Sequence, residues 1–164
     1  MKPRPASALY FGGTGLLLSL LVFKPFGGAA LFGPRASEIH WGLAATAISA
    51  LLSGLLLGGL FGHGFWDAAV LRPSYKRGLA PAFGVAFFSC PLTGFFAGLA
   101  VGARQAFFYH SLTPGRILPQ ALAMALLAWT FIFFVTPLVL ILSLVWMRLL
   151  RTLAVKKETG GFGR

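Results

Sequence analysis

The chain has 164 residues, of which 57% are hydrophobic and only 10% are charged. Soluble domains carry about 25% charged residues, so this composition excludes a soluble globular domain and indicates an integral membrane protein. Because Cys90 is the only cysteine, an intrachain disulfide and a dithiol redox mechanism are excluded as well.

Four uncharged stretches are long enough to cross a bilayer as helices, since about 30 Å of hydrocarbon requires about 20 helical residues. They cover residues 7–23, 41–65, 79–103 and 118–146. Apolar and polar residues do not alternate in runs such as 44–61, as they would in the strands of a membrane barrel. The sequence therefore predicts a single all-α membrane domain with four transmembrane helices.

The first of these stretches, 7–23, has two interpretations. It is short for a span, it follows basic residues, and the small residues 27–29 come after it, as in a cleaved secretory signal. Lys24 and Pro25 separate the apolar run from those small residues, which is unusual for a cleavage site. We expect the stretch to remain as the first span, and cleavage is the alternative.

Rows of small side chains run along the second and third stretches at a spacing of four residues. Each step of four advances an α-helix by about 400°, so a row forms one narrow groove along one face. Such grooves let the backbone of another helix approach closely in a membrane. The second stretch carries Gly42, Thr46, Ala50, Gly54, Gly58 and Gly62, and the third carries Ala82, Ala86, Cys90, Gly94, Gly98 and Gly102. We call these rows the two stripes and expect them to pack on each other, the simplest arrangement, or on partner proteins.

Prolines interrupt the third and fourth stretches near their middles, at Pro91 and Pro137. A proline removes the hydrogen bond to the carbonyl four residues earlier and bends the helix. We therefore expect a bend at each position, with the hydroxyls of Ser89 and Thr136 as partners for the freed carbonyls. Trp129 falls near mid-membrane, where its N–H needs a partner, so we expect it to face the bundle.

The distribution of basic residues predicts the orientation of the chain. Of the 14 lysines and arginines, ten lie in segments on one side of the predicted spans and four on the other. Basic loops mark the cytoplasmic side, so both termini and the loop 67–78 are predicted to be cytoplasmic, in a bacterial inner membrane. The net charge of +11 then reflects topology and contact with lipid headgroups, and no nucleic-acid partner is expected. The residues assigned to headgroups are Arg72, Lys76, Arg77, Arg148, Arg151, Lys156 and Lys157, and the polar tail 152–164 is expected to be disordered.

Carboxylates and recognisable catalytic sets are missing from the apolar stretches. The three carboxylates, Glu38, Asp67 and Glu158, all lie outside them. Proton-coupled transporters generally have an ionisable residue at depth in the membrane, and the rotor rings of vacuolar-type ATPases need a carboxylate there, so the sequence argues strongly against both classes. The serine and threonine hydroxyls of the second and third stretches have no neighbouring base. No catalytic residue is predicted, and the chain is not expected to be an enzyme.

Histidines are the remaining candidates for ligand binding. His63 lies inside the end of the second stretch, one helical turn before Asp67. A hydrogen bond to Asp67 or to a backbone carbonyl is its simplest role, and ligation of a haem or pigment is the alternative. On the opposite side of the membrane, Glu38, His40 and His110 are candidate ligands of a divalent metal, or ordinary interfacial residues. The leading interpretation includes no cofactor.

Three functional classes are compatible with this pattern. The leading hypothesis is a non-enzymatic accessory, assembly or scaffold subunit of a membrane complex, or a homo-oligomer, that acts through close helix packing. A small channel or transporter for a neutral solute or an ion is the second. A haem- or pigment-binding membrane subunit is the third. The expected partners are therefore the lipid bilayer and other membrane-protein subunits or further copies of the chain.

Overall fold

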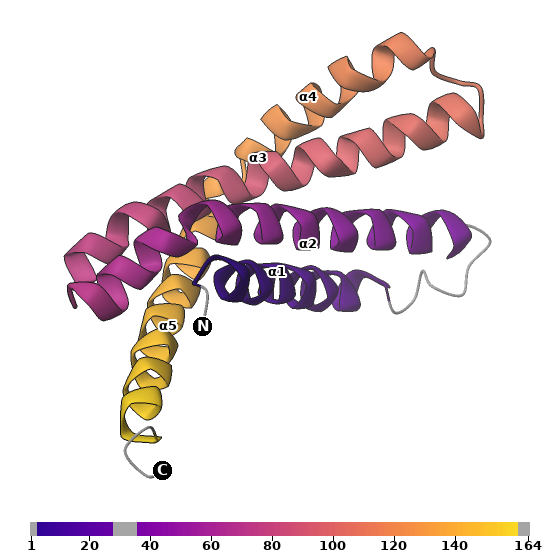
Figure 1. Ribbon diagram of the computed structural model, residues 1–164. Helices are drawn as coiled ribbons and strands as arrows, with labels where there is room; N and C mark the ends of the chain where they lie inside the picture. The colour runs from indigo at the N-terminus through magenta and orange to yellow at the C-terminus, as the bar shows by residue number, and fades with distance from the viewer. Residues whose placement is uncertain (1–2, 28–35, 161–164) are drawn as a thin grey trace.

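The computed structural model describes the backbone of residues 3–27 and 36–160 and the side chains of residues 4–20 and 41–155. Over these ranges the chain is helical and has no strand, which confirms the prediction of an all-α fold (Figure 1). The elements in chain order are α1 (Pro3–Gly27), α2 (Ala36–Trp66), the π-helical turn η2 (Asp67–Leu71), α3 (Tyr75–Phe107), the 3-10 turn η3 (Pro114–Arg116), α4 (Ile117–Trp129) and α5 (Ile132–Gly160).

Three helical segments within the described residues are long and apolar enough to cross a membrane. They are Trp41–Leu71, Tyr75–Phe107 and Ile132–Val155. The first two are joined by a short turn in which Arg72 has φ −137° and ψ 75°. Because Arg72 precedes a proline, the α-helical conformation is disfavoured for it, and the helix has to end here. The second and third predicted spans thus correspond to α2 and α3.

The prediction of one continuous span over 118–146 is wrong. The backbone breaks after Trp129, where the amides of Thr130 and Phe131 each donate to the carbonyl three residues earlier, at 3.1 Å. The Thr130 hydroxyl also donates to Leu127 O, at 2.6 Å, and such local bonds compete with a helical ladder. With its 13 residues, α4 is about 20 Å long and too short to span alone.

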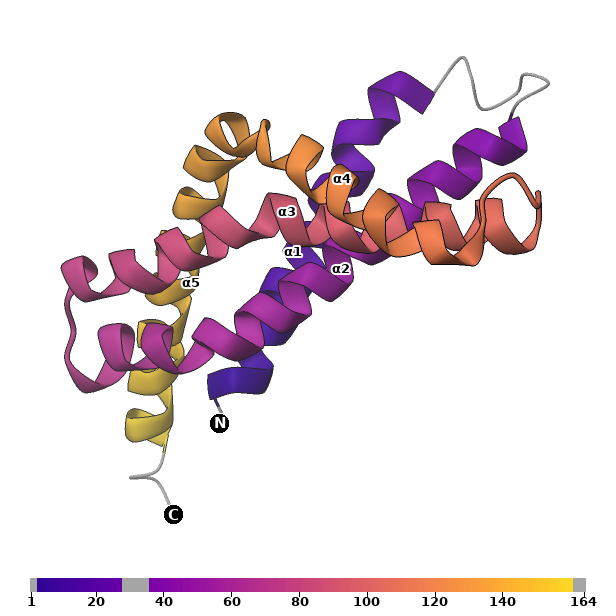
Figure 2. The ribbon, with the colours of Figure 1, turned by 90° about the horizontal axis from the view of Figure 1, so that it is seen from above.

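The second half of this region, α5, runs at a steep angle to α3 (Figure 1, Figure 2). Pro137 lies inside α5, downstream of the break that separates α4 from α5. The helix continues to Gly160, so residues 152–160 are helical where the sequence predicts a disordered tail. The proline therefore does not mark the place at which the chain changes direction.

The stripe of α2 packs against α1. A Cβ atom added at Gly54 would overlap the backbone of Phe11, and one added at Gly58 would overlap the backbone of Ser7. Gly42, at the other end of the stripe, has open space around it. The α1 and α2 helices therefore form a tight hairpin, and removal of α1 by cleavage would uncover this part of the stripe.

The stripe of α3 packs against α4. A Cβ atom added at Gly98 would lie 2.6 Å from Ala121 Cα, and one at Gly94 would lie 2.6 Å from a carbonyl oxygen of α4. The two stripes thus do not pack on each other, and the simplest arrangement expected from the sequence is wrong. Contacts between α2 and α3 include the ring of Phe61 against Gly84 and Pro81 against Gly64. At these glycines α1 covers the stripe of α2 and α4 covers the stripe of α3, whereas Ala82 and Ala86 of the α3 stripe lie in a core without α4.

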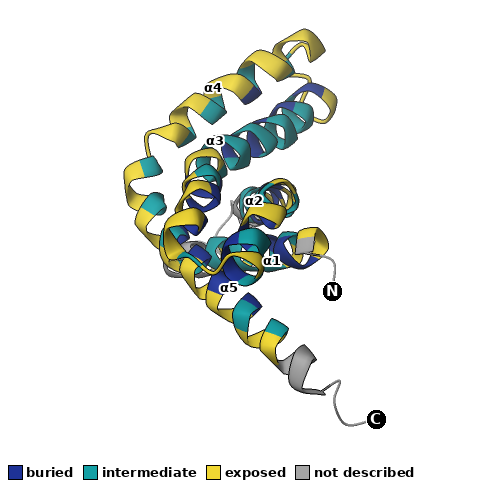
Figure 3. Cartoon of the chain, turned by 60° about the vertical axis from the view of Figure 1, so that its left-hand side comes forward, coloured by how far each residue is buried: buried dark blue, intermediate teal, exposed yellow. Residues whose placement is uncertain are grey.

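One end of the bundle contains a continuous buried core, which we call the packed end. Side chains of α1, α2, η2, α3 and α5 meet there, and α5 crosses the two hairpins (Figure 2). The core residues are Ala6, Phe11, Leu57, Phe65, Ala68, Ala69, Ala82, Val85, Ala86, Val139, Trp146, Met147 and Leu150. Toward the opposite end, which we call the open end, the α1–α2 and α3–α4 hairpins diverge (Figure 1), and exposed residues cover much of α4 (Figure 3).

Candidate functional site

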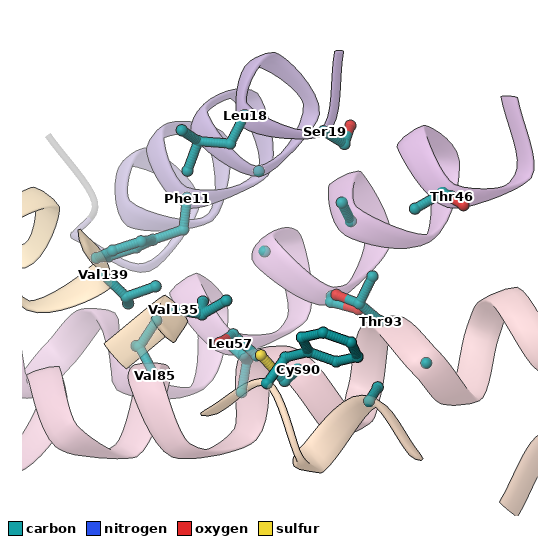
Figure 4. Close-up of a pocket in the computed structure, with 18 of the residues that line it drawn as sticks. Phe11, Leu18, Ser19, Thr46, Leu57, Val85, Cys90, Thr93, Val135 and Val139 are labelled. Atoms are coloured by element: carbon teal, nitrogen blue, oxygen red, sulfur yellow. The ribbon is translucent and has the colours of Figure 1, made fainter. Parts of the chain in front are cut away.

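A cavity of about 470 Å³ lies between the two hairpins. Its lining comes from all five α-helices, and Figure 4 shows part of it. Phe11, Leu57, Val85 and Val139 belong both to this lining and to the core of the packed end. The packed end therefore forms the floor of the cavity, and the cavity extends from there toward the open end. Its volume is within the range of about 300–1,000 Å³ that is usual for ligand pockets.

The lining changes in polarity from one end of the cavity to the other. Val85, Val135 and Val139 lie at the floor, whereas Ser19, Thr46 and Thr93 lie at the opposite end, which we call the mouth (Figure 4). No charged residue is among those that line the cavity. The floor can therefore contact only an apolar group, and the mouth can contact an uncharged polar one.

Most of the hydroxyl hydrogens in the cavity are already used. Ser19, Thr46 and Ser53 each donate to a backbone carbonyl three or four residues earlier in their own helix, at 2.7–2.9 Å. Their oxygens remain available only as acceptors. The Thr93 hydroxyl makes no hydrogen bond with any described residue and so remains available as a donor. The Cys90 thiol lies between floor and mouth (Figure 4).

The histidines do not form a site within the described part of the chain. His63 is exposed, and its side chain makes no hydrogen bond to Asp67 or to another described residue. His110 is exposed in the loop before η3, with φ +50°. The side chains of Glu38 and His40 lie outside the described residues. Among those that are described, no three of the residues that usually bind metals come together.

Arg151 has a structural contact that sequence reasoning missed. Its Nε donates to Ala69 O at 3.2 Å, and its guanidinium lies 4.4 Å from the centre of the Tyr75 ring. A cation beside the last carbonyls of a helix is stabilised by the helix dipole, and the ring adds a cation–π contact. The sequence assigns Arg151 to lipid headgroups because it follows an apolar stretch. Its neighbours Arg72, Lys76, Arg77 and Arg148 are exposed, and Lys156 and Lys157 have no described side chains.

Two tryptophans occupy places that the sequence does not reveal. Trp146 is buried, donates its indole N–H to Ser7 Oγ at 2.9 Å and stacks on Tyr10 with ring centres 4.5 Å apart. Trp129, which we expected to face the bundle, is 41% exposed and contacts the edge of Phe87 with ring centres 5.3 Å apart. The side chain of Trp129 lies outside the bundle because the helix breaks just after it. Trp146 joins the core because α5 crosses α1.

An exposed group of aromatic side chains surrounds the break between α4 and α5. Phe133 and Phe134 are 84% and 81% exposed. We call the group the aromatic patch, and it consists of Phe87, Phe88, Trp129, Phe133 and Phe134. The Phe133 carbonyl lacks its usual helical donor because Pro137 has no amide hydrogen. The Thr136 hydroxyl, expected to repair this loss, makes no hydrogen bond with a described residue, and Ser89 donates to Ala86 O rather than to the carbonyl that Pro91 frees.

The residues that line the cavity and those of the aromatic patch carry no charge, and the Cys90 thiol in the cavity lining is their only side chain of a type that commonly binds metals or, as a thiolate, acts as a nucleophile. What the two places offer is apolar contact, in the first case inside the bundle and in the second on its surface. Comparison with protein families, with characterised proteins and with solved structures finds no match to this chain.

Proposed function

We propose that the chain is a non-enzymatic subunit of a bacterial inner-membrane complex, acting as an accessory, assembly or scaffold protein. Its partner, another membrane protein or a second copy of the chain, contacts the aromatic patch. The observation that carries this proposal is the helix break in the middle of the bundle, on an exposed surface.

The depth of the break makes a lipid-only environment unfavourable. Trp129 contacts Phe87, which is 12 residues or about 18 Å from the start of α3 at Tyr75. Breaks in the helical ladder at such a depth are tolerated only where protein or water covers them, because lipid tails cannot hydrogen-bond to free carbonyls. The residues Phe133 and Phe134 beside this carbonyl are exposed in the single chain. A partner that supplies a hydrogen-bond donor would remove this cost.

The composition of the patch supports a protein partner over lipid. Aromatic side chains are enriched in the cores of protein interfaces, where they contribute much of the binding energy. In contact with lipid, tryptophan gathers instead near the membrane surfaces, whereas Trp129 lies at the depth of Phe87. The stripes do not supply this interface, because α1 and α4 cover Gly54, Gly58, Gly94 and Gly98 within the chain. We therefore assign to the aromatic patch the partner binding that the sequence suggests for the stripes.

Photo-crosslinking tests the proposal directly. A photoreactive phenylalanine analogue at position 133 should give a discrete adduct with another membrane protein, or with a second copy, after irradiation of membranes. The same analogue at Leu60, which is 67% exposed on α2, is the matched control and should give lipid adducts. A folded protein whose position 133 gives lipid adducts alone would contradict the proposal.

The orientation is a separate part of the proposal. With both termini and the α2–α3 turn in the cytoplasm, the packed end lies on the cytoplasmic side and the open end on the periplasmic side. Reporter fusions after Gly78 and after Arg164 should both give cytoplasmic signals. A periplasmic signal at either position contradicts this topology.

The two alternative functions have less support. A permeation path needs a continuous opening, whereas the cavity ends on the buried core at Leu57 and Val85. A haem-binding role needs a second ligand at the depth of His63, and no other histidine with a described side chain lies at the packed end. Helix packing with a partner therefore remains the leading proposal.

A further inference from the structure

The cavity between the hairpins is explained neither by packing within the chain nor by a partner at the aromatic patch. Close packing is achieved on both sides of it, at Gly54 against Phe11 and at Gly94 against α4. The same chain nevertheless leaves about 470 Å³ between these two contacts. Since well-packed interiors contain few voids larger than a water molecule, a space of this size calls for an occupant.

Water is a poor occupant of the floor. A buried water needs two to four polar partners, and cavities lined by aliphatic and aromatic side chains stay dry. The floor is lined by Phe11, Leu57, Val85 and Val139. Ser53, which also contributes to the lining, already donates its hydroxyl hydrogen to its own helix at 2.7 Å. The occupant is therefore apolar over most of its length.

The length of the cavity matches one leaflet of a bilayer. Along α3, Val85 at the floor and Thr93 at the mouth are about 12 Å apart, and along α2 Leu57 and Thr46 are about 16 Å apart. Half of the roughly 30 Å hydrocarbon core is about 15 Å. A single chain that runs through one leaflet would thus reach from the mouth to the floor.

The mouth and the region above it match the polar end of a phospholipid. The Thr93 hydroxyl can donate to an ester carbonyl, which joins the acyl chain to the headgroup. Five residues above Thr46 along α2, about 7.5 Å away, stands Trp41, and the Arg104 guanidinium lies 5.2 Å from the centre of its ring. A phosphate above the ester would therefore meet a positive charge. A hydrocarbon without an ester or a phosphate would leave both groups unused.

From these observations we infer that the cavity binds one acyl chain of a membrane phospholipid. The end of the chain contacts Val135 and Val139, the ester lies beside Thr93, and the phosphate lies near Arg104. On the proposed orientation this lipid belongs to the periplasmic leaflet. Because the lipid fills space between the hairpins, it serves as a structural ligand of the bundle.

The unmodified protein allows a first test through Cys90, its only cysteine. The full chain is purified in mild detergent, stripped of lipid and then mixed with vesicles of palmitoyl-oleoyl phosphatidylglycerol. Native mass spectrometry should show one phospholipid retained per chain, and reaction of Cys90 with N-ethylmaleimide should become slower when the lipid is bound. Retention of detergent only, or of an isoprenoid from the membrane, would overturn the inference, as would an unchanged rate at Cys90.

Variants that fill the cavity give the second test. Cys90→Phe from α3 and Val135→Phe from α5 should each abolish lipid retention, whereas Ala80→Phe on the exposed side of α3 should not. Thr93→Val keeps the shape and removes the donor, so it should weaken retention by about two- to tenfold. Phospholipid retained equally by both filled variants, each with a normal unfolding transition, would overturn the inference.

A control separates this inference from the proposed function. Phe133→Ala changes the aromatic patch and does not touch the cavity lining. It should reduce partner binding and leave lipid retention at the level of the unmodified protein. Loss of lipid in Phe133→Ala would show that the two places are not independent and would overturn the assignment of the lipid to the cavity.

Discussion

The packed end and the open end hold their helices together by different means. At the packed end, side chains far apart in sequence are joined by polar contacts, as in the bond from Trp146 to Ser7 and the bond from Arg151 to Ala69. At the open end, the bond from Gln120 to Gln105, at 3.0 Å, joins the two helices of one hairpin. Small residues thus build each hairpin, and α5 with its polar groups joins one hairpin to the other. The predictions below test this division.

The largest loss of stability is expected from substitution of a stripe glycine that lies against the backbone of the neighbouring helix. Gly58→Leu places a side chain against the backbone of Ser7, so α1 has to move away from α2. We expect a loss of about 1–3 kcal/mol in the free energy of unfolding, as is usual for overpacking. Gly98→Leu should act in the same way on α4 through Ala121. Unfolding of the purified protein in mixed detergent micelles measures both changes.

Gly59 provides the matched control for Gly58. It is the next residue in the chain, is also a glycine, and has no atom near the position of an added Cβ. Gly59→Leu should leave the unfolding free energy nearly unchanged, and the conservative change Leu56→Ile should also be mild. Equal tolerance of leucine at positions 58 and 59 would show that the stripe does not hold the hairpin together.

A smaller effect is expected for the contact between α5 and α1. Ser7→Ala leaves the buried Trp146 indole N–H without its acceptor, which should cost about 1–3 kcal/mol toward the lower end of that range, because alanine keeps the packing. Ser19→Ala at the mouth of the cavity should cost less, since the Ser19 hydroxyl donates only to its own helix. If the two variants have the same unfolding free energy, the bond from Trp146 to Ser7 does not contribute to holding α5 against α1.

Replacement of Arg151 should have an effect of about 1 kcal/mol. Arg151→Gln removes the charge next to the end of η2 and the cation–π contact with Tyr75. Arg148→Gln, three residues earlier on the exposed side of α5, is the control and should have almost no effect. The prediction is tested by comparing how much unfolding free energy each variant loses relative to the unmodified protein. Equal losses would show that Arg151 makes only a contact with lipid headgroups.

The smallest effect is expected at His63. Because its side chain is exposed and has no described partner, His63→Gln should change the unfolding free energy by less than about 0.5 kcal/mol. The purified protein should have the same absorbance spectrum before and after the change. A visible absorbance band that disappears in the variant would reinstate a cofactor at this residue.

The sequence predicts the helices better than it predicts their neighbours. Long uncharged stretches and the Arg72–Pro73 step are local properties, and they place α2, α3 and the turn between them correctly. A stripe of small residues shows that some backbone comes close, and it does not identify that backbone. The choice of α1 and α4 depends on how the helices are rotated, which no local pattern encodes.

The region after the third span shows a second limit. Pro137 is the strongest local signal there, yet the helix breaks at Thr130, inside an uncharged run. Once the chain turns at that point, Trp146 and Arg151 reach α1 and η2, and α5 contributes to the lining of the cavity. These contacts follow from the direction of α5, so residue types alone could not have predicted them.

The bond between Trp146 and Ser7 joins residues 139 positions apart, and this separation sets an order for biogenesis. Each hairpin consists of neighbouring helices, so it can form as soon as its second helix leaves the ribosome. The contacts that join the hairpins can form only after α5 is synthesised. Until then α1 and α2 lie in the bilayer without α5 as a neighbour. Lipid therefore has access to the inner faces of both hairpins before the last helix arrives to enclose them.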